Sequence, residues 1–327
     1  MESLRIMRDL NKLDPDIRRF VEMMREEWKN YPPLETLSFP EQRAAAQKAR
    51  EPWSSGGPEM AETEDFVFDA GAGELGLRIH RPRPRGGTAL TPVMVYIHGG
   101  GFTLFSNATH DRLMREYAAL GGFTVIGIDY PLAPETRYPA ALDRIEALML
   151  WLGDNAAQWR LDPGRIAMAG DSAGGNLSFA TCLRLRERGR LDLVRCILSN
   201  YGGFSCDISD EAEARFGGPG SIMDRAEAEG YWRNYLRGAE DRNDPQACPL
   251  LADLTGFPPV FLVIPELDLV AEHSFAMTQK LVAARVETTA AVYPGATHSF
   301  LEAMSISPLA RRAIAAGASF TASHLSA

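Results

Sequence analysis

The stretch Gly-Asp-Ser-Ala-Gly-Gly at positions 170–175 constrains the fold more than any other part of the chain. It lies between an apolar run, 166–169, which predicts a buried strand, and a segment of helical composition, 176–188. A serine on such a turn points its hydroxyl away from the backbone, and the glycines leave room for the adjoining strand and helix. The first helical amides also point at any negative charge that develops there. We predict a nucleophilic role for Ser172 and an amide donor at Ala173; the alternative is a tight turn without chemistry.

Two further residues stand where a serine nucleophile needs partners. A serine hydroxyl requires a base, and the base requires an orienting acid. Asp268 follows a predicted strand at 260–264, and His298 follows another at 288–293. Each alone could be structural, Asp268 as a helix cap and His298 as a turn residue. Together with Ser172 they have the Ser, Asp, His order of the α/β hydrolases, and this order predicts a catalytic triad.

A glycine-rich segment, His-Gly-Gly-Gly-Phe at 98–102, directly follows the predicted strand at 92–97. Three glycines let a backbone approach a ligand closely and present its N–H groups. We therefore predict that Gly100 and Gly101, together with Ala173, donate hydrogen bonds to an oxyanion. The alternative is a flexible turn. His98 is expected to hold this loop by hydrogen bonds rather than to transfer protons.

The remaining pattern predicts an α/β fold, with a mainly parallel central sheet and helices on both faces. Short apolar strands alternate with helical segments, and several strands are apolar throughout, which indicates burial on both faces. The other strands are expected at 65–68, 75–81, 124–128 and 194–198, and the other helices at 111–120 and 140–152.

Two regions outside this alternation predict a helical cap. Near the N-terminus, 14–28 carries one apolar face at helical spacing, and 40–50 is alanine-rich. A linker is expected at 51–60, and the stretch 201–249 is expected to be irregular. The helices could simply pack on the domain, and the aromatic side chains of 201–249 could mostly form a small core of their own. The expected organisation is a cap region and linker at 1–57 and a catalytic domain at 58–327, with a cap insertion at about 202–245.

Composition excludes some partners. The 327 residues carry a formal net charge of −9, which argues against nucleic acid or an anionic membrane as a main partner. No segment has the length of a signal peptide core or a membrane span. The four cysteines include no Cys-x-x-Cys pair and are expected to be free, buried thiols. We therefore expect a cytoplasmic protein without a metal site.

These motifs together resemble the hormone-sensitive-lipase-like (bacterial family IV) esterases of the α/β-hydrolase fold, in the Gly-Asp-Ser-Ala-Gly branch. The resemblance covers roughly residue 64 to the C-terminus, and the matching segments are 98–102, 129–135, 138–143, 170–176, 244–250, 266–268 and His298. It implies a carboxylesterase that hydrolyses short- to medium-chain esters through an acyl-enzyme, with no cofactor or metal, beneath a cap. The expected partner is a small-molecule ester, and the resemblance also implies a homodimer.

The chain departs from that family at several positions. Pro131 replaces a usual arginine, Cys248 a serine and Ser299 a glycine, and Leu-Val-Ala-Glu at 269–272 replaces Pro-Leu-x-Asp. These replacements remove no catalytic group. Those at 269, 270 and 299 border the predicted site, so the range of substrates is expected to differ from that of the family. The candidate substrate-binding side chains are Phe102, Phe105, Tyr201, Phe204, Trp232, Leu269, Val270 and Phe300. The same machinery would also serve an amidase, arylformamidase or lactonase specific for one metabolite, and a non-catalytic binding protein is a remote alternative.

Overall fold

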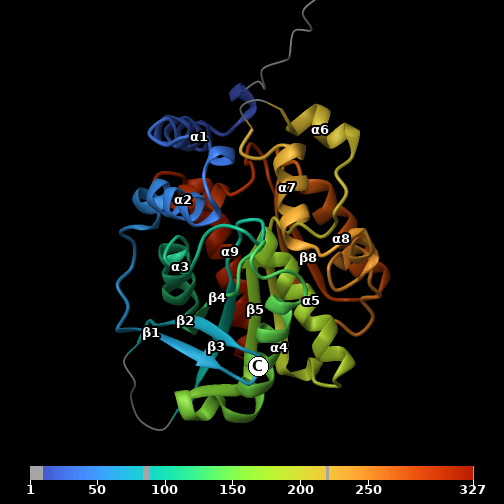
Figure 1. Cartoon of the computed structure of the whole chain (residues 1–327). Coiled ribbons are helices and arrows are strands. Elements are labelled where there is room, and N and C mark those ends of the chain that lie inside the picture. Colours follow the sequence, from blue (N-terminus) through green and yellow to red (C-terminus); the bar gives the residue numbers. More distant parts are fainter. Residues whose placement is uncertain (1–9, 84–88, 219–220, 327) are drawn as a thin grey trace, which may run out of the picture.

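The computed structural model describes residues 10–83, 89–218 and 221–326, which are built around an eight-stranded sheet (Figure 1). The strand order is β1-β2-β4-β3-β5-β6-β7-β8. β1 and β2 pair antiparallel, as do β2 and β4, whereas all other neighbours are parallel. The strands are β1 (Glu62–Asp69), β2 (Glu74–Arg81), β3 (Thr91–Ile97), β4 (Thr124–Asp129), β5 (Leu161–Asp171), β6 (Val194–Asn200), β7 (Val260–Pro265) and β8 (Thr288–Tyr293).

The register of the central strands places the two glycine-rich motifs side by side. β3 and β5 run parallel, with Ile97 opposite Gly170. The chain that leaves β3 is therefore the neighbour of the turn that leaves β5. β7 and β8 end at the same edge of the sheet, where Pro265 lies opposite Tyr293. All the predicted catalytic residues thus follow the carboxyl ends of parallel strands, which is where open α/β sheets bind ligands.

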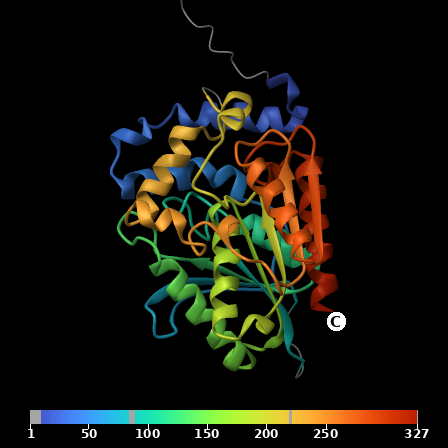
Figure 2. The same cartoon turned by 90° about the vertical axis from the view of Figure 1, so that its right-hand side faces the viewer.

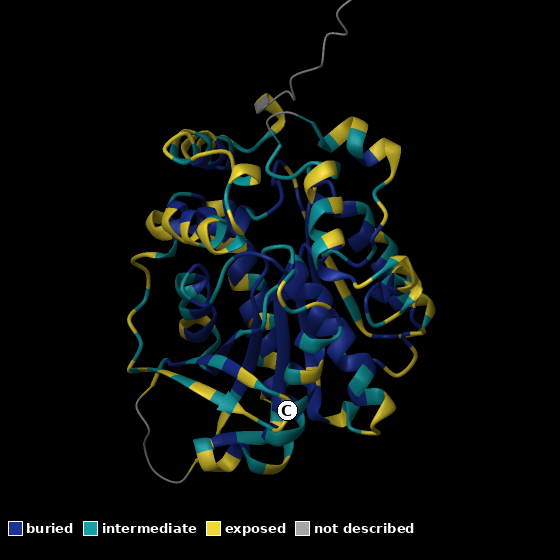
Figure 3. Ribbon diagram, viewed as in Figure 1, coloured by how far each residue is buried: buried dark blue, intermediate teal, exposed yellow. Residues whose placement is uncertain are grey.

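Helices cover both faces of the sheet, which is the predicted arrangement (Figure 1). One face carries α3 (Asp111–Gly121) and α9 (Pro308–Leu325), and the other carries α4 (Ala140–Asn155), α5 (Ala173–Glu187) and α8 (Ala271–Ala283). Each face has its own apolar core, and the central strands between the two cores are buried (Figure 3). This explains why β3, β4 and β7 are almost continuously apolar.

Four more helices lie over the carboxyl ends of the strands (Figures 1 and 2). They are α1 (Pro15–Trp28), α2 (Phe39–Ser54), α6 (Asp210–Phe216) and α7 (Arg225–Tyr235). The carboxylate of Asp14 accepts hydrogen bonds from the amides of Asp16 and Ile17 and so begins α1. Short 3-10 helices are η1 (Leu10–Lys12), η2 (Leu34–Thr36), η3 (Ala156–Trp159), η4 (Leu191–Leu193), η5 (Ala239–Asn243), η6 (Pro249–Leu251) and η7 (Phe300–Ser305).

The expected linker at 51–60 was wrong in its first residues, because α2 continues to Ser54 despite Pro52. Trp53 is buried in that last turn and contacts the ring of Phe20 edge-on, with ring centroids 4.8 Å apart. Burial of a large aromatic side chain outweighs the hydrogen bond that proline removes. The helix that follows Ser172 also begins earlier than expected, at residue 173 rather than 176.

The stretch 201–249, expected to be irregular, contains α6 and α7. Their N-caps are Ser209 and Asp224, whose side chains accept from amides of the first turn. Its aromatic residues do not mostly form a core of their own. Tyr235 stacks on Phe102 with ring centroids 3.8 Å apart, because α7 lies across the loop after β3.

All four cysteines are buried, as expected, and the structure joins none of them in a disulfide. Two of them meet, with the Sγ atoms of Cys206 and Cys248 2.8 Å apart. Across the described ranges, no helix combines the length and apolarity needed to cross a bilayer.

Candidate active site

Ser172, Asp268 and His298, far apart in sequence, are brought into hydrogen-bond contact. The Nε2 atom of His298 lies 3.0 Å from Oγ of Ser172, and its Nδ1 atom lies 2.9 Å from Oδ2 of Asp268. A carboxylate only accepts hydrogen bonds, so Nδ1 carries the imidazole proton and Nε2 is free to accept from the serine hydroxyl. The other carboxylate oxygen of Asp268 accepts from the Val270 amide at 3.1 Å, which fixes its plane.

The environment of His298 favours its protonated form. Burial lowers the pKa of His298, but the charge and hydrogen bond of Asp268 outweigh burial, so the pKa lies above its ordinary value. The ring of Tyr201 meets the imidazole edge-on, with centroids 5.0 Å apart. The imidazole is thus able to accept a proton and to stabilise the charge that results.

The backbone at Ser172 is strained in the way that a strand-to-helix turn requires. Its φ of 52° lies in the left-handed region, which non-glycine residues rarely adopt. The strain is held by packing: a Cβ at Gly174 would overlap the carbonyl oxygen of Ile97. The serine amide donates to the Asn200 carbonyl at 2.9 Å. The hydroxyl therefore projects into open space above the sheet.

The loop after β3 also uses conformations that suit glycine. Gly100 has φ 106° and Gly101 has φ 58°. The loop folds back on itself, because the amides of Thr103 and Leu104 both donate to the Gly100 carbonyl. Ala173 is the first residue of α5, and the first amides of a helix have no intrahelical acceptor. The loop and the helix start thus flank the serine from two sides.

A buried carboxylate, Asp171, joins the strand-to-helix turn at Ser172 to this loop. It accepts from the Tyr96 hydroxyl at 2.8 Å, from the Gly99 amide at 3.1 Å and from Nε2 of His110 at 3.3 Å. Burial raises the pKa of Asp171, but His110 and the Tyr96 hydrogen bond outweigh burial and hold the pKa below its ordinary value. Tyr96 and His110 belong to no sequence motif, so their contacts with Asp171 were not predicted.

His98 holds its loop, as expected. Its Nδ1 atom lies 2.7 Å from the Gly99 carbonyl oxygen, and its ring stacks on Tyr130 with centroids 4.5 Å apart. Burial lowers the pKa of His98 to about 4, helped by the charge of His110, so the ring is neutral near pH 7. A neutral ring donates from one nitrogen, which suits a structural hydrogen bond to a carbonyl.

A cavity of about 1070 Å³ opens above Ser172 and His298, between the sheet and the cap helices. Its floor includes Gly100 and Gly101, and its walls come from α1, α2, α7 and the segment between α1 and α2. Of the predicted substrate-binding side chains, Phe105 lines it. Trp28 of α1 also lines it, and so do several residues that no sequence pattern indicated: Tyr31, Arg50, Met223, Glu227 and Tyr231.

A much smaller side pocket of about 40 Å³ also borders Ser172. Among the predicted substrate-binding residues, Phe102, Trp232 and Val270 line it, together with Ser172 and Ala173. The other four predicted side chains pack in the interior instead. Tyr201 and Phe300 are packed with each other, Phe204 contacts Phe179 of α5, and Leu269 packs against Ala212 and Ala228. Each is apolar and lies near the site in sequence, so only tertiary packing distinguishes core from pocket.

The cap is attached to the loop after β3 by Arg43 of α2. Its Nε donates to the Thr103 carbonyl at 2.9 Å, and one Nη donates to the Ala133 carbonyl at 2.9 Å. The same guanidinium binds both carboxylate oxygens of Glu135. Two helical turns later, Arg50 lies 4.3 Å above the Phe105 ring. α2 therefore anchors this loop.

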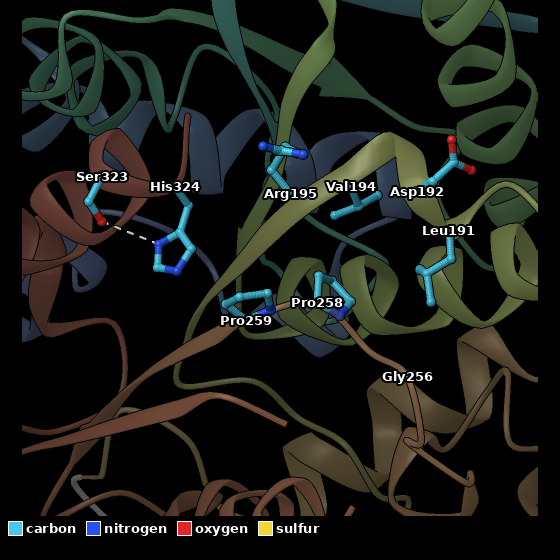
Figure 4. A pocket seen from close by; sticks show the side chains of 9 residues that line it. All are labelled: Leu191, Asp192, Val194, Arg195, Gly256, Pro258, Pro259, Ser323 and His324. Carbon is cyan, nitrogen blue, oxygen red and sulfur yellow. Dashed lines mark hydrogen bonds between the residues drawn. The ribbon is translucent and has the colours of Figure 1, made fainter. Parts of the chain in front are cut away.

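A second hollow of about 560 Å³ lies at the opposite end of the sheet, beside the starts of β6 and β7 (Figure 4). Asp192, Arg195 and His324 line it, with two prolines between them. None of the predicted site residues borders it. Within the described ranges, no group of three or more His, Cys, Asp or Glu side chains could hold a metal ion.

Comparison with known proteins also identifies a hydrolase. A protein-family model described as the alpha/beta hydrolase fold matches residues 94–302. An acetyl esterase of Salmonella paratyphi B is 35% identical over 271 residues, which are 82% of each chain. An acetyl esterase of Salmonella typhi is similar to the same extent.

Solved structures of an alpha/beta hydrolase and of an esterase superpose closely on this chain. The Ser161Ala mutant of LAE6, an alpha/beta hydrolase enzyme from the metagenome of Lake Arreo, has a TM-score of 0.89 at 30% identity. That match covers 97% of this chain and all of the other. The hyperthermophilic esterase of Pyrobaculum calidifontis has a TM-score of 0.87 at 29% identity, covering 95% of this chain and 98% of the esterase.

Proposed function

This chain belongs to the α/β hydrolase family and is a carboxylesterase similar to hormone-sensitive lipase, and from that premise we propose that Ser172, Asp268 and His298 are its catalytic triad. The observation that carries the proposal is the unbroken chain of contacts from Oγ of Ser172 through the imidazole to the carboxylate, at 3.0 and 2.9 Å. This is the geometry that a serine needs to lose its proton as it attacks.

The proposed reaction proceeds through an acyl-enzyme. Oγ of Ser172 attacks the ester carbonyl carbon while Nε2 of His298 takes the hydroxyl proton. The resulting oxyanion accepts hydrogen bonds from the amides of Gly100, Gly101 and Ala173. The intermediate collapses, the alkoxide leaves with the proton from His298, and the acyl group stays on the serine. Water then attacks in the same way, releasing the carboxylic acid and restoring the serine.

The two unequal spaces beside the serine suggest which part of the ester goes where. The side pocket of about 40 Å³ has room for roughly three water-sized groups, which corresponds to an acyl chain of a few carbons. The cavity of about 1070 Å³ has room for a much larger group. We therefore place the acyl chain in the side pocket and the alcohol in the cavity, and propose short acyl chains as the preferred substrates. The relatives of this chain that are acetyl esterases support this choice.

The cap and the cellular location belong to the same proposal. We assign 1–57 and about 202–245 to a cap over a catalytic domain at 58–327. The position of α1, α2, α6 and α7 above the strand ends supports this division (Figure 2). The four free cysteines support a reducing compartment, and hence the cytoplasm.

Initial rates on p-nitrophenyl acetate, butyrate, hexanoate and decanoate test the proposed function. Wild type should be fastest on the two shortest esters, and Ser172→Ala should lose the activity. Val270→Ala enlarges the side pocket and should move the optimum toward longer chains. Val282→Ala, which removes the same two methyl groups from an exposed position on α8, should leave the optimum in place. A wild-type rate that is highest on decanoate would contradict the placement of the acyl chain.

A further inference from the structure

We propose that Glu227 selects the alcohol part of the substrate, by binding a hydrogen-bond donor or a positive charge on that part with its carboxylate. The inference rests on the proposed function, because it needs the alcohol to occupy the large cavity. It adds a specificity-determining residue and a substrate class: esters of short acids with polar alcohols that carry a hydroxyl or a cationic nitrogen.

Glu227 lies in the wall of the cavity whose floor holds Ser172 and His298. It belongs to the first turn of α7, and one turn later the Tyr231 hydroxyl donates to its Oε1 atom at 2.7 Å. The Tyr231 ring in turn lies against Gly101, since a Cβ on that glycine would overlap the ring. The carboxylate is therefore held in a defined direction, close to the loop that flanks the reacting serine.

No described residue forms an ion pair with this carboxylate, and Arg50 and His298 attract it only at longer range. Both arginines in the cavity wall are paired elsewhere. Nε of Arg50 lies 2.8 Å from Glu302, and the guanidinium of Arg233 lies 3.9 Å from Glu229. Burial raises the pKa of Glu227, and the opposing hydrogen bond of Tyr231 does not compensate. A carboxylate that lines the cavity, stays accessible to solvent and forms no ion pair is available to a donor from a ligand.

A structural role in the helix does not account for this orientation. Glutamate at the third position of a helix often turns back to the N-cap amide, and Glu41 does so in α2, where its carboxylate accepts from the Ser38 amide at 2.8 Å. Glu227 occupies the same position in α7, yet its side chain meets Tyr231 and the cavity instead. The cap of α7 is made by Asp224, whose side chain accepts from the Glu227 amide at 2.9 Å.

The rest of the cavity wall suits a polar or cationic alcohol. The walls carry the aromatic rings of Trp28, Tyr31, Phe39, Phe105 and Tyr231. Aromatic faces attract cations and also pack against the carbon atoms of a polyol or an alkylammonium group. With the ester carbonyl at Ser172 and the acyl chain in the side pocket, the alcohol extends beneath α7 and reaches the carboxylate.

Two matched pairs of acetate esters test the proposal and separate the two kinds of donor. 4-Hydroxybutyl acetate and pentyl acetate differ by a terminal hydroxyl, and acetylcholine and 3,3-dimethylbutyl acetate differ by a charge. We expect wild type to prefer the polar member of at least one pair in kcat/KM by roughly tenfold, the worth of one hydrogen bond or contact with a charged group. Each ratio is measured within one preparation, so a loss of folded protein cancels.

Two variants then identify the source of the preference. Glu227→Met removes acceptor and charge and should abolish either preference. Glu227→Gln keeps an acceptor but removes the charge, so it should keep most of a hydroxyl preference and lose a choline preference. The control is Glu229→Gln, which removes the same charge from an exposed side chain of the same helix and should keep the wild-type ratios.

The outcomes distinguish a failure of the role of Glu227 from a failure of the proposed esterase function. A wild-type enzyme that hydrolyses all four esters without preference, or Glu227→Met with wild-type ratios, would overturn the role of Glu227 and leave the esterase mechanism standing. A wild-type enzyme that hydrolyses none of the four esters and no p-nitrophenyl acetate would instead remove the proposed function itself.

Discussion

Adding one methyl group at Gly101 should reduce catalysis far more than it reduces stability. Gly101 has φ 58°, and a Cβ built there would overlap Cγ, Cδ1 and Cδ2 of the Tyr231 ring. Carbon atoms normally touch at about 3.5–4.0 Å, so the ring or the loop must move by about 1 Å or more in Gly101→Ala. The Tyr231 hydroxyl is held by Glu227, so we expect the loop to move, and this movement turns the Gly101 amide away from the position that the oxyanion would occupy.

The expected cost follows from that displacement. A misaligned oxyanion donor costs about 3 kcal/mol in the transition state, which corresponds to a loss of about 10²–10³ in kcat. The left-handed backbone costs alanine only about 1–2 kcal/mol of stability. The assay is kcat on p-nitrophenyl acetate, together with the free energy of unfolding in urea.

The matched control for this prediction is Gly230→Ala. It adds the same methyl group to the same cavity wall, where the nearest atom would be 3.5 Å away on the flexible Arg233 side chain. It should keep kcat within about twofold, since no donor moves. Removing the ring in Gly101→Ala/Tyr231→Ala should restore part of the lost kcat. A Gly101→Ala enzyme that is folded and as fast as wild type would refute the placement of the oxyanion.

Two further predictions concern groups that hold the site in place. The kcat/KM of wild type should fall at acidic pH, because only the neutral ring of His298 accepts a proton. The apparent pKa of this fall should lie above the ordinary histidine value, since Asp268 raises the pKa of His298 by more than burial lowers it. Asp268→Asn removes the main influence that opposes burial and leaves only the weaker attraction of Asp171 and Glu227, so the acid limb of the profile should move to lower pH. The plateau should drop about 10⁴-fold, and a limb that moves to higher pH would contradict this. Arg43→Met should lower the free energy of unfolding in urea by about 1–3 kcal/mol, because two backbone carbonyls lose a charged donor. The ion pair with half-exposed Glu135 contributes little to this loss of stability. Arg233→Met, which removes an exposed guanidinium with one ion pair at 3.9 Å, should lower the free energy of unfolding much less. Equal decreases in the two variants would show that the hydrogen bonds of Arg43 are not stabilising.

The sequence was informative wherever chemistry depends on a few consecutive residues. The turn around Ser172, the loop with Gly100 and Gly101, and the residues Asp268 and His298 each follow the end of a strand. A parallel sheet brings such ends together, so local patterns were enough to predict that these residues meet.

The sequence was uninformative about the walls of the cavity. Glu227 and Arg50 lie on cap helices, and nothing in the spacing of charged residues along such a helix tells a charge that faces the cavity from one that faces solvent. Their direction is decided by contacts with Tyr231 and Glu302, which no local pattern encodes. Phe204 was expected in the pocket and lies in the core for the same reason, since an apolar residue fits either place.

Covalent labelling of Ser172 tests the central claim most directly. Diethyl p-nitrophenyl phosphate transfers its phosphoryl group to an activated serine and releases p-nitrophenol. The triad geometry predicts loss of all esterase activity in step with one diethylphosphoryl group per chain, located on the peptide that contains Ser172. Ser172→Ala should remain unlabelled and inactive. Labelling at another residue, or full activity in Ser172→Ala, would show that the serine above β5 is not the nucleophile.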